Sequence, residues 1–154
     1  ADMILLQLEI PLDVTKTIIE LAEKYGKNVI LNPAPAISYI DSFDKCSYFT
    51  PNECEAEILF GKDYLTYMCN NNINGVITLG DKGCIVVENG NVTRIPAKKV
   101  KAIDTTGAGD VFNGALTYML ASGADLTTAA IYANKMASKS VQYHYVLEGI
   151  SKLV

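Results

Sequence analysis

No run of basic residues, no Cys-x-x-Cys pair and no apolar stretch of membrane-spanning length occurs in the sequence. The formal net charge is −4, which argues against nucleic acid or a membrane surface as the main partner. The sequence also begins without the basic-then-apolar order of a signal peptide, so we expect a cytoplasmic protein. A small anionic ligand would therefore need a local pocket rather than a generally basic surface.

Cysteine and histidine are too scattered to predict a metal site. Cys46, Cys54, Cys69 and Cys84 have no metal-ligand spacing with the single histidine, His144. We expect reduced, structural thiols, as is usual in a cytosol, and no zinc site. His144 is interpreted as a partly exposed structural residue rather than a catalytic group.

Apolar runs and helical spacings alternate along the chain and predict one three-layer α/β domain over residues 1–154. With 49% hydrophobic residues, the chain can bury a single core of ordinary size. Asn89-Gly90 predicts a hairpin, so the strands from residue 75 onward form an antiparallel meander at the edge of an otherwise mostly parallel sheet. Strands are expected at 3–8, 28–31, 47–50, 75–79, 84–88, 91–95 and 99–103, and helices between Pro11 and Gly26, at 39–43, between Pro51 and Gly61, and at 62–69, 110–121 and 126–141.

The stretch from Asp104 to Asp110, Asp-Thr-Thr-Gly-Ala-Gly-Asp, lies directly before a helical pattern. Gly107 and Gly109 leave the backbone open to a ligand, and the first N–H groups of a helix have no internal partner. This corner should therefore bind an anion, and we interpret the anion as a phosphate. A carboxylate beside a phosphate is repelled unless a metal offsets it or it accepts a proton, so we interpret Asp110 as a base. The alternative is that Asp110 only caps the helix and the glycines only form a turn.

The same stretch fits neither common nucleotide loop, because no Gly-Lys-Ser/Thr ending occurs and Phe112 replaces the third glycine of Gly-x-Gly-x-x-Gly. It resembles the C-terminal signature of the ribokinase (PfkB) family, Asp-Thr-x-Gly-Ala-Gly-Asp, at every fixed position. The resemblance implies a ribokinase-like fold and in-line transfer of the ATP γ-phosphoryl group to a sugar hydroxyl, most closely that of ribose. It also implies that Asp110 contacts the sugar and takes its proton, while the backbone of Gly107, Ala108 and Gly109 forms an anion hole.

Further matches to the family are spread along the chain, and each also has a plain structural interpretation. Glu9 corresponds to a sugar-binding glutamate, or it is an exposed carboxylate before Pro11. Asn32-Pro33-Ala34-Pro35-Ala36 is very similar to the family's sequence at that place. For the nucleotide and magnesium, the resemblance implies Asn52 near the phosphates, Glu55 organising Mg²⁺ through water, Thr78, Gly80 and Gly83 in a nucleotide turn, and Asn134 beside adenine. The structural alternatives are a first-turn acid for Glu55, a hairpin turn for 78–83 and a solvated helix position for Asn134.

Two departures from the family pattern carry expectations of their own. The family's N-terminal half, with its glycine-rich sugar motif and small β lid, has no counterpart, so we expect the chain alone to be inactive. Residues 3–8 would then form an unpaired apolar edge, which predicts either self-association, for example as a homodimer, or partial disorder. The resemblance implies that Asp104 and Thr106 hold a monovalent cation such as K⁺, but residues 141–146 replace the Gly-Ala-containing loop that completes this site in the family.

The residues leave other functions open. Within the family, the acceptor is alternatively fructose, 2-keto-3-deoxygluconate or a nucleoside. Outside enzymology, the chain is alternatively a nucleotide-binding or interaction module without chemistry.

Overall fold

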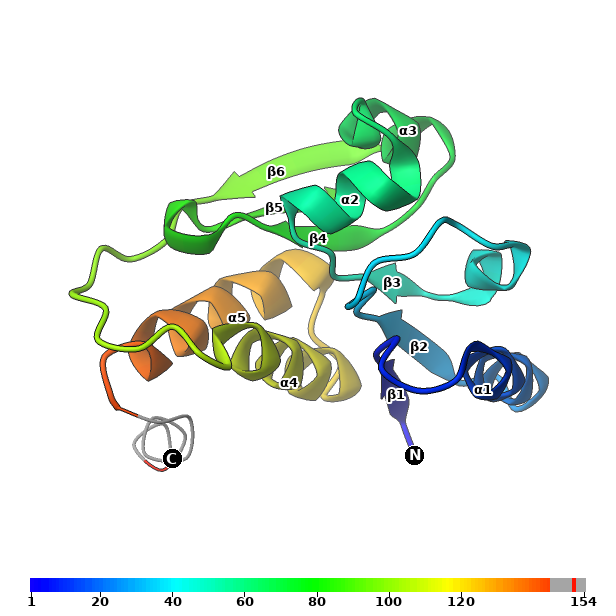
Figure 1. Cartoon of the computed structure of the whole chain (residues 1–154), viewed down its shortest axis with the longest axis horizontal. Coiled ribbons are helices and arrows are strands. Elements are labelled where there is room, and N and C mark those ends of the chain that lie inside the picture. Colours follow the sequence, from blue (N-terminus) through cyan, green and yellow to red (C-terminus); the bar gives the residue numbers. More distant parts are fainter. Residues whose placement is uncertain (145–150, 152–154) are drawn as a thin grey trace.

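A six-stranded sheet forms the centre of the computed structural model, which describes residues 1–144 and residue 151 (Figure 1). The strands lie in the sheet in the order in which they occur in the chain. The pairs β1/β2, β2/β3 and β3/β4 are parallel. The pairs β4/β5 and β5/β6 are antiparallel, and the Asn89-Gly90 hairpin predicts the second of them. The strands are β1 (Met3–Leu6), β2 (Asn28–Leu31), β3 (Tyr48–Phe49), β4 (Gly75–Thr78), β5 (Cys84–Glu88) and β6 (Asn91–Ile95).

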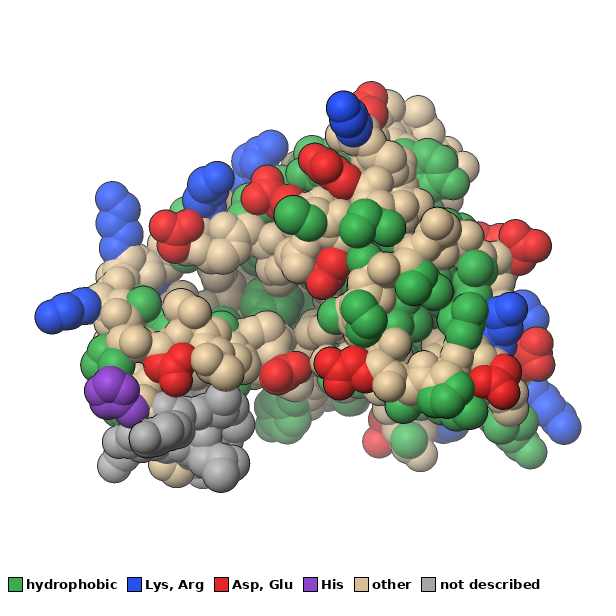
Figure 2. Space-filling view, in the orientation of Figure 1, with side chains coloured by type: hydrophobic (Ala, Val, Ile, Leu, Met, Phe, Trp, Pro, Cys, Tyr) green, Lys and Arg blue, Asp and Glu red, His purple; other side chains and the backbone are tan. Residues whose placement is uncertain are grey.

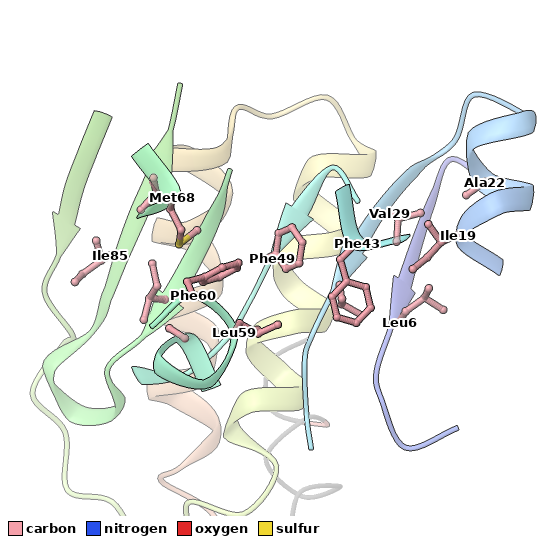
Figure 3. Packing of buried hydrophobic residues seen from close by; sticks show 14 residues of the cluster. Leu6, Ile19, Ala22, Val29, Phe43, Phe49, Leu59, Phe60, Met68 and Ile85 are labelled. Carbon is pink, nitrogen blue, oxygen red and sulfur yellow. The ribbon is translucent and has the colours of Figure 1, made fainter. Parts of the chain in front are cut away.

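Helices cover both faces of this sheet and give the predicted three layers. The described helices are α1 (Leu12–Lys24), η1 (Asp41–Lys45), α2 (Glu53–Phe60), α3 (Tyr64–Asn70), η2 (Gly80–Lys82), α4 (Ala108–Ala121) and α5 (Leu126–Ser140), of which η1 and η2 are short 3₁₀ helices. One buried cluster joins the sheet to α1, α2 and α3, with Phe43, Phe49 and Phe60 among its members (Figure 3). A second cluster joins the other face to α4 and α5 through Phe112, Leu116 and a row of small residues on α5 that includes Ala129 and Ala133.

The expected strand at residues 99–103 is wrong. This segment has no strand pairing and crosses between β6 and α4 as an irregular loop. The backbone N–H groups of Ile103 and Asp104 donate to the carbonyl of Val141 instead, at 2.7 and 3.2 Å. Lys98, Lys99 and Val100 of this loop line a cavity beside α5.

β1 forms an open edge of the sheet. It pairs with β2 on one side, and the described part of the chain places no strand on its other side. The continuous apolar run at 3–8 predicts a strand buried on both faces, but the side chain of Leu5 is 37% exposed, so that prediction is wrong. β1 also ends at Leu6 rather than at residue 8.

No helix among the described residues is long and apolar enough to cross a membrane.

The four cysteines are free thiols in very different environments. Cys54 is exposed at the start of α2. Burial raises the pKa of Cys46 and of Cys84 to about 12, because the apolar surroundings disfavour the thiolate.

We predict that iodoacetamide labels Cys54 much faster than Cys46 or Cys84 in the native protein at about pH 8. A thiol whose pKa lies near 12 stays protonated far below that pH, and the thiolate is the nucleophile. Mass spectrometry of timed samples measures the three rates, and denaturant should make all of them similar. Equal rates in the native protein would contradict the structure.

Candidate active site

Three neutral polar side chains form a row where the first three parallel strands end. Gln7, Asn32 and Thr50 directly follow β1, β2 and β3, and the strand register aligns the residues before them, Leu6 with Leu31 and Leu31 with Phe49. The N–H groups of Asn32 and Thr50 continue the ladder by donating to the carbonyls of Leu6 and Leu31. Because side chains alternate along a strand, the row lies on the same face as Ile30 and Tyr48, which pack in the α4 and α5 cluster. It therefore faces α4.

The first turn of α4 completes the site opposite this row. The helix begins at Ala108, two residues before the predicted start, and Gly107 is its N-cap with φ +71°. A left-handed residue at this point favours glycine, and no side chain caps the helix. The carboxylate of Asp104 accepts the Thr106 N–H at 2.9 Å and stabilises the preceding turn. Open space surrounds the place where Gly109 would carry a Cβ atom, so a ligand can approach the backbone there.

A cavity of about 250 Å³ lies between the strand ends and α4. It brings together most of the residues that sequence analysis connected with the sugar, the phosphates and the metal, although they are as far apart as Glu9 and Asp110 in the chain. Its lining includes Gln7, Glu9, Asn32, Thr50, Asn52, Glu55, Thr78, Gly107, Gly109, Asp110 and Asn113. Open α/β sheets place ligands at this edge, beyond the carboxyl ends of their strands.

A larger cavity of about 610 Å³ adjoins the first, since Thr78 and Gly109 line both. Figure 2 shows the surface hollowed between the η2 turn and the first turn of α4. The lining includes the predicted nucleotide-turn residues Gly80 and Gly83, together with Phe112 of α4 and Asn134 of α5. Asn134 is 8% exposed and its side-chain amide donates to the carbonyl of Pro96 at 3.0 Å, so it is not a solvated helix position.

Asp110 is exposed on the first turn of α4, and its side chain points toward the end of β1. The side-chain amide of Gln7 donates a hydrogen bond to Asp110 Oδ1 at 3.2 Å. Sequence analysis missed Gln7. The signal that could have found it is its place as the first polar residue after an apolar run, at the edge where parallel strands bind ligands.

Asn52 and Glu55 form a reciprocal cap at the start of α2. The Asn52 side chain accepts the Glu55 N–H at 2.9 Å, and Glu55 Oε2 accepts the Asn52 N–H at 2.8 Å. Both residues also line the smaller cavity, so the capping role and a ligand role are compatible. Among the described residues, no group of three acidic, histidine or cysteine side chains could hold a metal ion alone. Magnesium at Glu55 would therefore need phosphate oxygens and water as its other ligands.

Comparison with known proteins identifies the family. The model for pfkB family carbohydrate kinases matches residues 1–153. The chain belongs to this family. A ribokinase of Schizosaccharomyces pombe is 34% identical in a match that covers 99% of this chain and 53% of the ribokinase. A deoxyribokinase of Salmonella typhimurium is 37% identical in a match that covers 90% of this chain and 49% of the deoxyribokinase. The chain thus spans about half the length of the curated relatives that it matches.

Solved structures show the same fold. The ribokinase of Thermotoga maritima superposes with a TM-score of 0.83 at 34% identity, over 97% of this chain and 53% of that one. The ribokinase of Arabidopsis thaliana complexed with ribose and ATP superposes with a TM-score of 0.88 at 24% identity, over 97% of this chain and 52% of that one. At this identity the similarity is evidence for the fold and not for the function. The ribokinase-like fold expected from the sequence is therefore confirmed.

The segment expected to hold a monovalent cation lies beside the larger cavity. Asp104 and Thr106 line neither cavity, although Thr105 between them lines the larger one. The backbone around Asp104 contacts the end of α5 through Val141. Residues 145 and 146, part of the run that departs from the family loop, lie outside the described residues. His144 is exposed and lines neither cavity.

Two polar side chains in the floor of the smaller cavity lack hydrogen-bond partners within the part of the chain that the structure describes. Thr50 Oγ1 and Asn113 Oδ1 have none, although the residues are only 3% and 4% exposed. Sequence analysis missed both residues. A buried oxygen without a partner costs roughly 1–3 kcal/mol.

We predict that Thr50→Val leaves the free energy of unfolding unchanged or raises it by up to about 2 kcal/mol, because valine has nearly the same shape and removes the unsatisfied oxygen. Urea unfolding followed by circular dichroism measures this. The control is Thr128→Val, which removes a hydroxyl that donates to Asp125 at 2.8 Å, and it should lower stability by about 1 kcal/mol. A loss in Thr50→Val as large as in the control would contradict the prediction.

Proposed function

We propose that the chain is the nucleotide-binding and catalytic part of an ATP-dependent sugar kinase whose preferred acceptor is ribose or a closely related pentose. The observation that carries this proposal is the position of Asp110, at the uncapped N-terminus of α4 and in one cavity with Glu9, Glu55 and Thr78. A proton acceptor beside a helix N-terminus suits the transfer of a phosphoryl group to an alcohol.

In the proposed reaction, the oxygen of a sugar hydroxyl attacks the γ-phosphorus of ATP as the bond to the β,γ-bridging oxygen breaks, and ADP leaves. Asp110 takes the proton that the hydroxyl loses. The N–H groups at the start of α4 stabilise the negative charge on the transferred group, because they are not engaged by a side-chain cap. No covalent enzyme intermediate is needed.

Most of the remaining predicted residues line one of the two cavities. Thr78, Gly80, Gly83 and Asn134 hold the nucleotide in the larger cavity, and Asn52 lies near its phosphates. Glu55 would hold hydrated magnesium, which would supply positive charge to offset the negative charge of the phosphates. Glu9 binds the sugar. A cation site at Asp104 and Thr106 remains part of the proposal, with K⁺ as the ion.

The names of the relatives guide the choice of acceptor. The two curated relatives are named ribokinase and deoxyribokinase. The sugars in these names, ribose and deoxyribose, differ by one hydroxyl group. The test is an acceptor screen on the complete product of the gene, with ADP release measured for ribose, 2-deoxyribose, fructose, 2-keto-3-deoxygluconate and a nucleoside. We expect a pentose to give at least about tenfold higher kcat/KM than the other acceptors. No ADP release above background with any acceptor would favour a non-catalytic nucleotide-binding module.

We further predict that the purified 154-residue chain does not phosphorylate ribose at an appreciable rate. It spans about half the length of its relatives, and positioning and water exclusion supply much of the catalysis in phosphoryl transfer. A coupled assay for ADP, with and without ribose, measures the rate. Robust ribose-dependent ADP release from the chain alone would contradict this prediction and leave the kinase assignment intact.

A further inference from the structure

We propose that Gln7 is a positioning residue that orients the Asp110 carboxylate for proton acceptance; this inference rests on the proposed kinase function. The residues are 103 positions apart in the chain, yet the Gln7 side-chain amide donates to Asp110 Oδ1 at 3.2 Å. The bond joins the end of β1 to the first turn of α4, two elements that pack against each other.

Asp110 needs such a contact because its own surroundings do not fix it. It is exposed on a first helical turn, where an aspartate can rotate toward its own backbone or toward water. An amide hydrogen bond to Oδ1 limits rotation of the carboxylate and leaves Oδ2 to face the acceptor. A displacement of about 1 Å at a catalytic group can cost about 100-fold in rate, so this restraint matters.

The backbone of Gln7 is held firmly enough to serve as the support. The residue before it, Leu6, accepts the Asn32 N–H at 2.8 Å, and the residue after it, Leu8, donates to the carbonyl of Ala34 at 3.0 Å. The backbone on both sides of Gln7 is therefore bonded to the segment that directly follows β2, and its side chain begins from a position set by these bonds.

The chemical nature of the side chain also suits the task. Glu9 and Glu55 line the same cavity as Asp110, so a third acidic neighbour would add repulsion. A lysine or arginine at residue 7 would stabilise the ionised form of the Asp110 carboxylate. The carboxylate would then have a lower affinity for a proton and would be a weaker base. A neutral amide donates a hydrogen bond without either effect.

The test is a double-mutant cycle in the complete product of the gene. We expect Gln7→Leu to lower kcat about 10- to 100-fold with KM for ATP within about twofold, and Gln7→Glu to lower kcat further through charge repulsion. If Gln7 acts through Asp110, adding Gln7→Leu to Asp110→Asn should lower the rate by less than about threefold more. The control is Asn71→Leu, which removes an amide that donates to a backbone carbonyl on α3 at 2.8 Å, and it should keep wild-type kcat.

A second measurement does not depend on activity. In ¹⁵N-edited NMR spectra of the 154-residue chain, the side-chain amide signals of Gln7 should shift in Asp110→Asn, while those of Asn71 should not. Wild-type kcat in Gln7→Leu, full additivity in the cycle, or unshifted Gln7 signals would each overturn the inference. Wild-type turnover in Asp110→Asn would instead overturn the proposed function, so the two failures are distinguishable.

Discussion

Replacing Asp110 by asparagine is expected to lower turnover of the complete gene product by about 10²- to 10⁴-fold, while the affinity for ATP stays nearly unchanged. Asparagine has almost the same shape and keeps the contact with Gln7 within reach, but it cannot accept the proton of an acceptor hydroxyl. The loss should therefore fall on kcat, because the base acts in the transition state and contributes little to binding of the nucleotide.

Steady-state kinetics with ribose, together with calorimetry of ATP binding, separates these two effects. Asp125→Asn is the control, since it makes the same substitution at an aspartate that caps α5 and lines neither cavity. The control should retain turnover within about twofold, because asparagine caps helices as well as aspartate does. If Asp110→Asn lost ATP binding and turnover equally, Asp110 would be a structural residue and the mechanism would be wrong.

Substituting Gly83 by alanine is expected to lower the free energy of unfolding by about 3 kcal/mol or more. Gly83 has φ +103°, and a Cβ atom there would overlap the backbone carbonyl of Ile95 and lie 2.6 Å from the backbone nitrogen of Ala97. Backbone atoms of β6 cannot move away as a flexible side chain could, so strain and steric overlap add. ATP binding should weaken as well, because Gly83 lines the proposed nucleotide cavity.

Gly80→Ala in the same turn separates steric overlap from the backbone conformation. Gly80 also has a positive φ, +61°, but no atom lies within 4 Å of where its Cβ would be. It should cost only about 1–2 kcal/mol. Urea unfolding of both variants gives the comparison, and equal losses would show that the close approach of β6 to Gly83 is not as the structure has it.

The site could be predicted from the sequence to the extent that local patterns determine it. Gly107 and Asp110 are identified by a contiguous motif before a helical pattern, and parallel strands bring their ends to one edge. Glu9, Asn52 and Thr78 follow or flank strands, so topology gathers them into the same cavity. In each case, chain order and strand direction are sufficient.

What the sequence did not reveal depends on contacts between distant elements. Gln7 and Thr50 are ordinary polar residues until the register of three strands turns them toward α4. Asn113 lies within an otherwise apolar helical pattern, and only its burial without a partner distinguishes it. A strand is expected at residues 99–103, but the backbone at Ile103 and Asp104 bonds to Val141 at the end of α5 instead, so tertiary packing overrides the local preference.

The central claim is that the amides at the start of α4 receive the nucleotide phosphates beside Asp110, and titration of the ¹⁵N-labelled chain with ATP and magnesium tests it most directly. The largest chemical-shift changes should fall on the backbone amides of Gly107, Ala108, Gly109 and Asp110, with further changes at Thr78, Gly80 and Gly83. The amides of α1, which line neither cavity, should not change. No shifts, or shifts centred on α1 or on another surface away from the two cavities, would contradict the account.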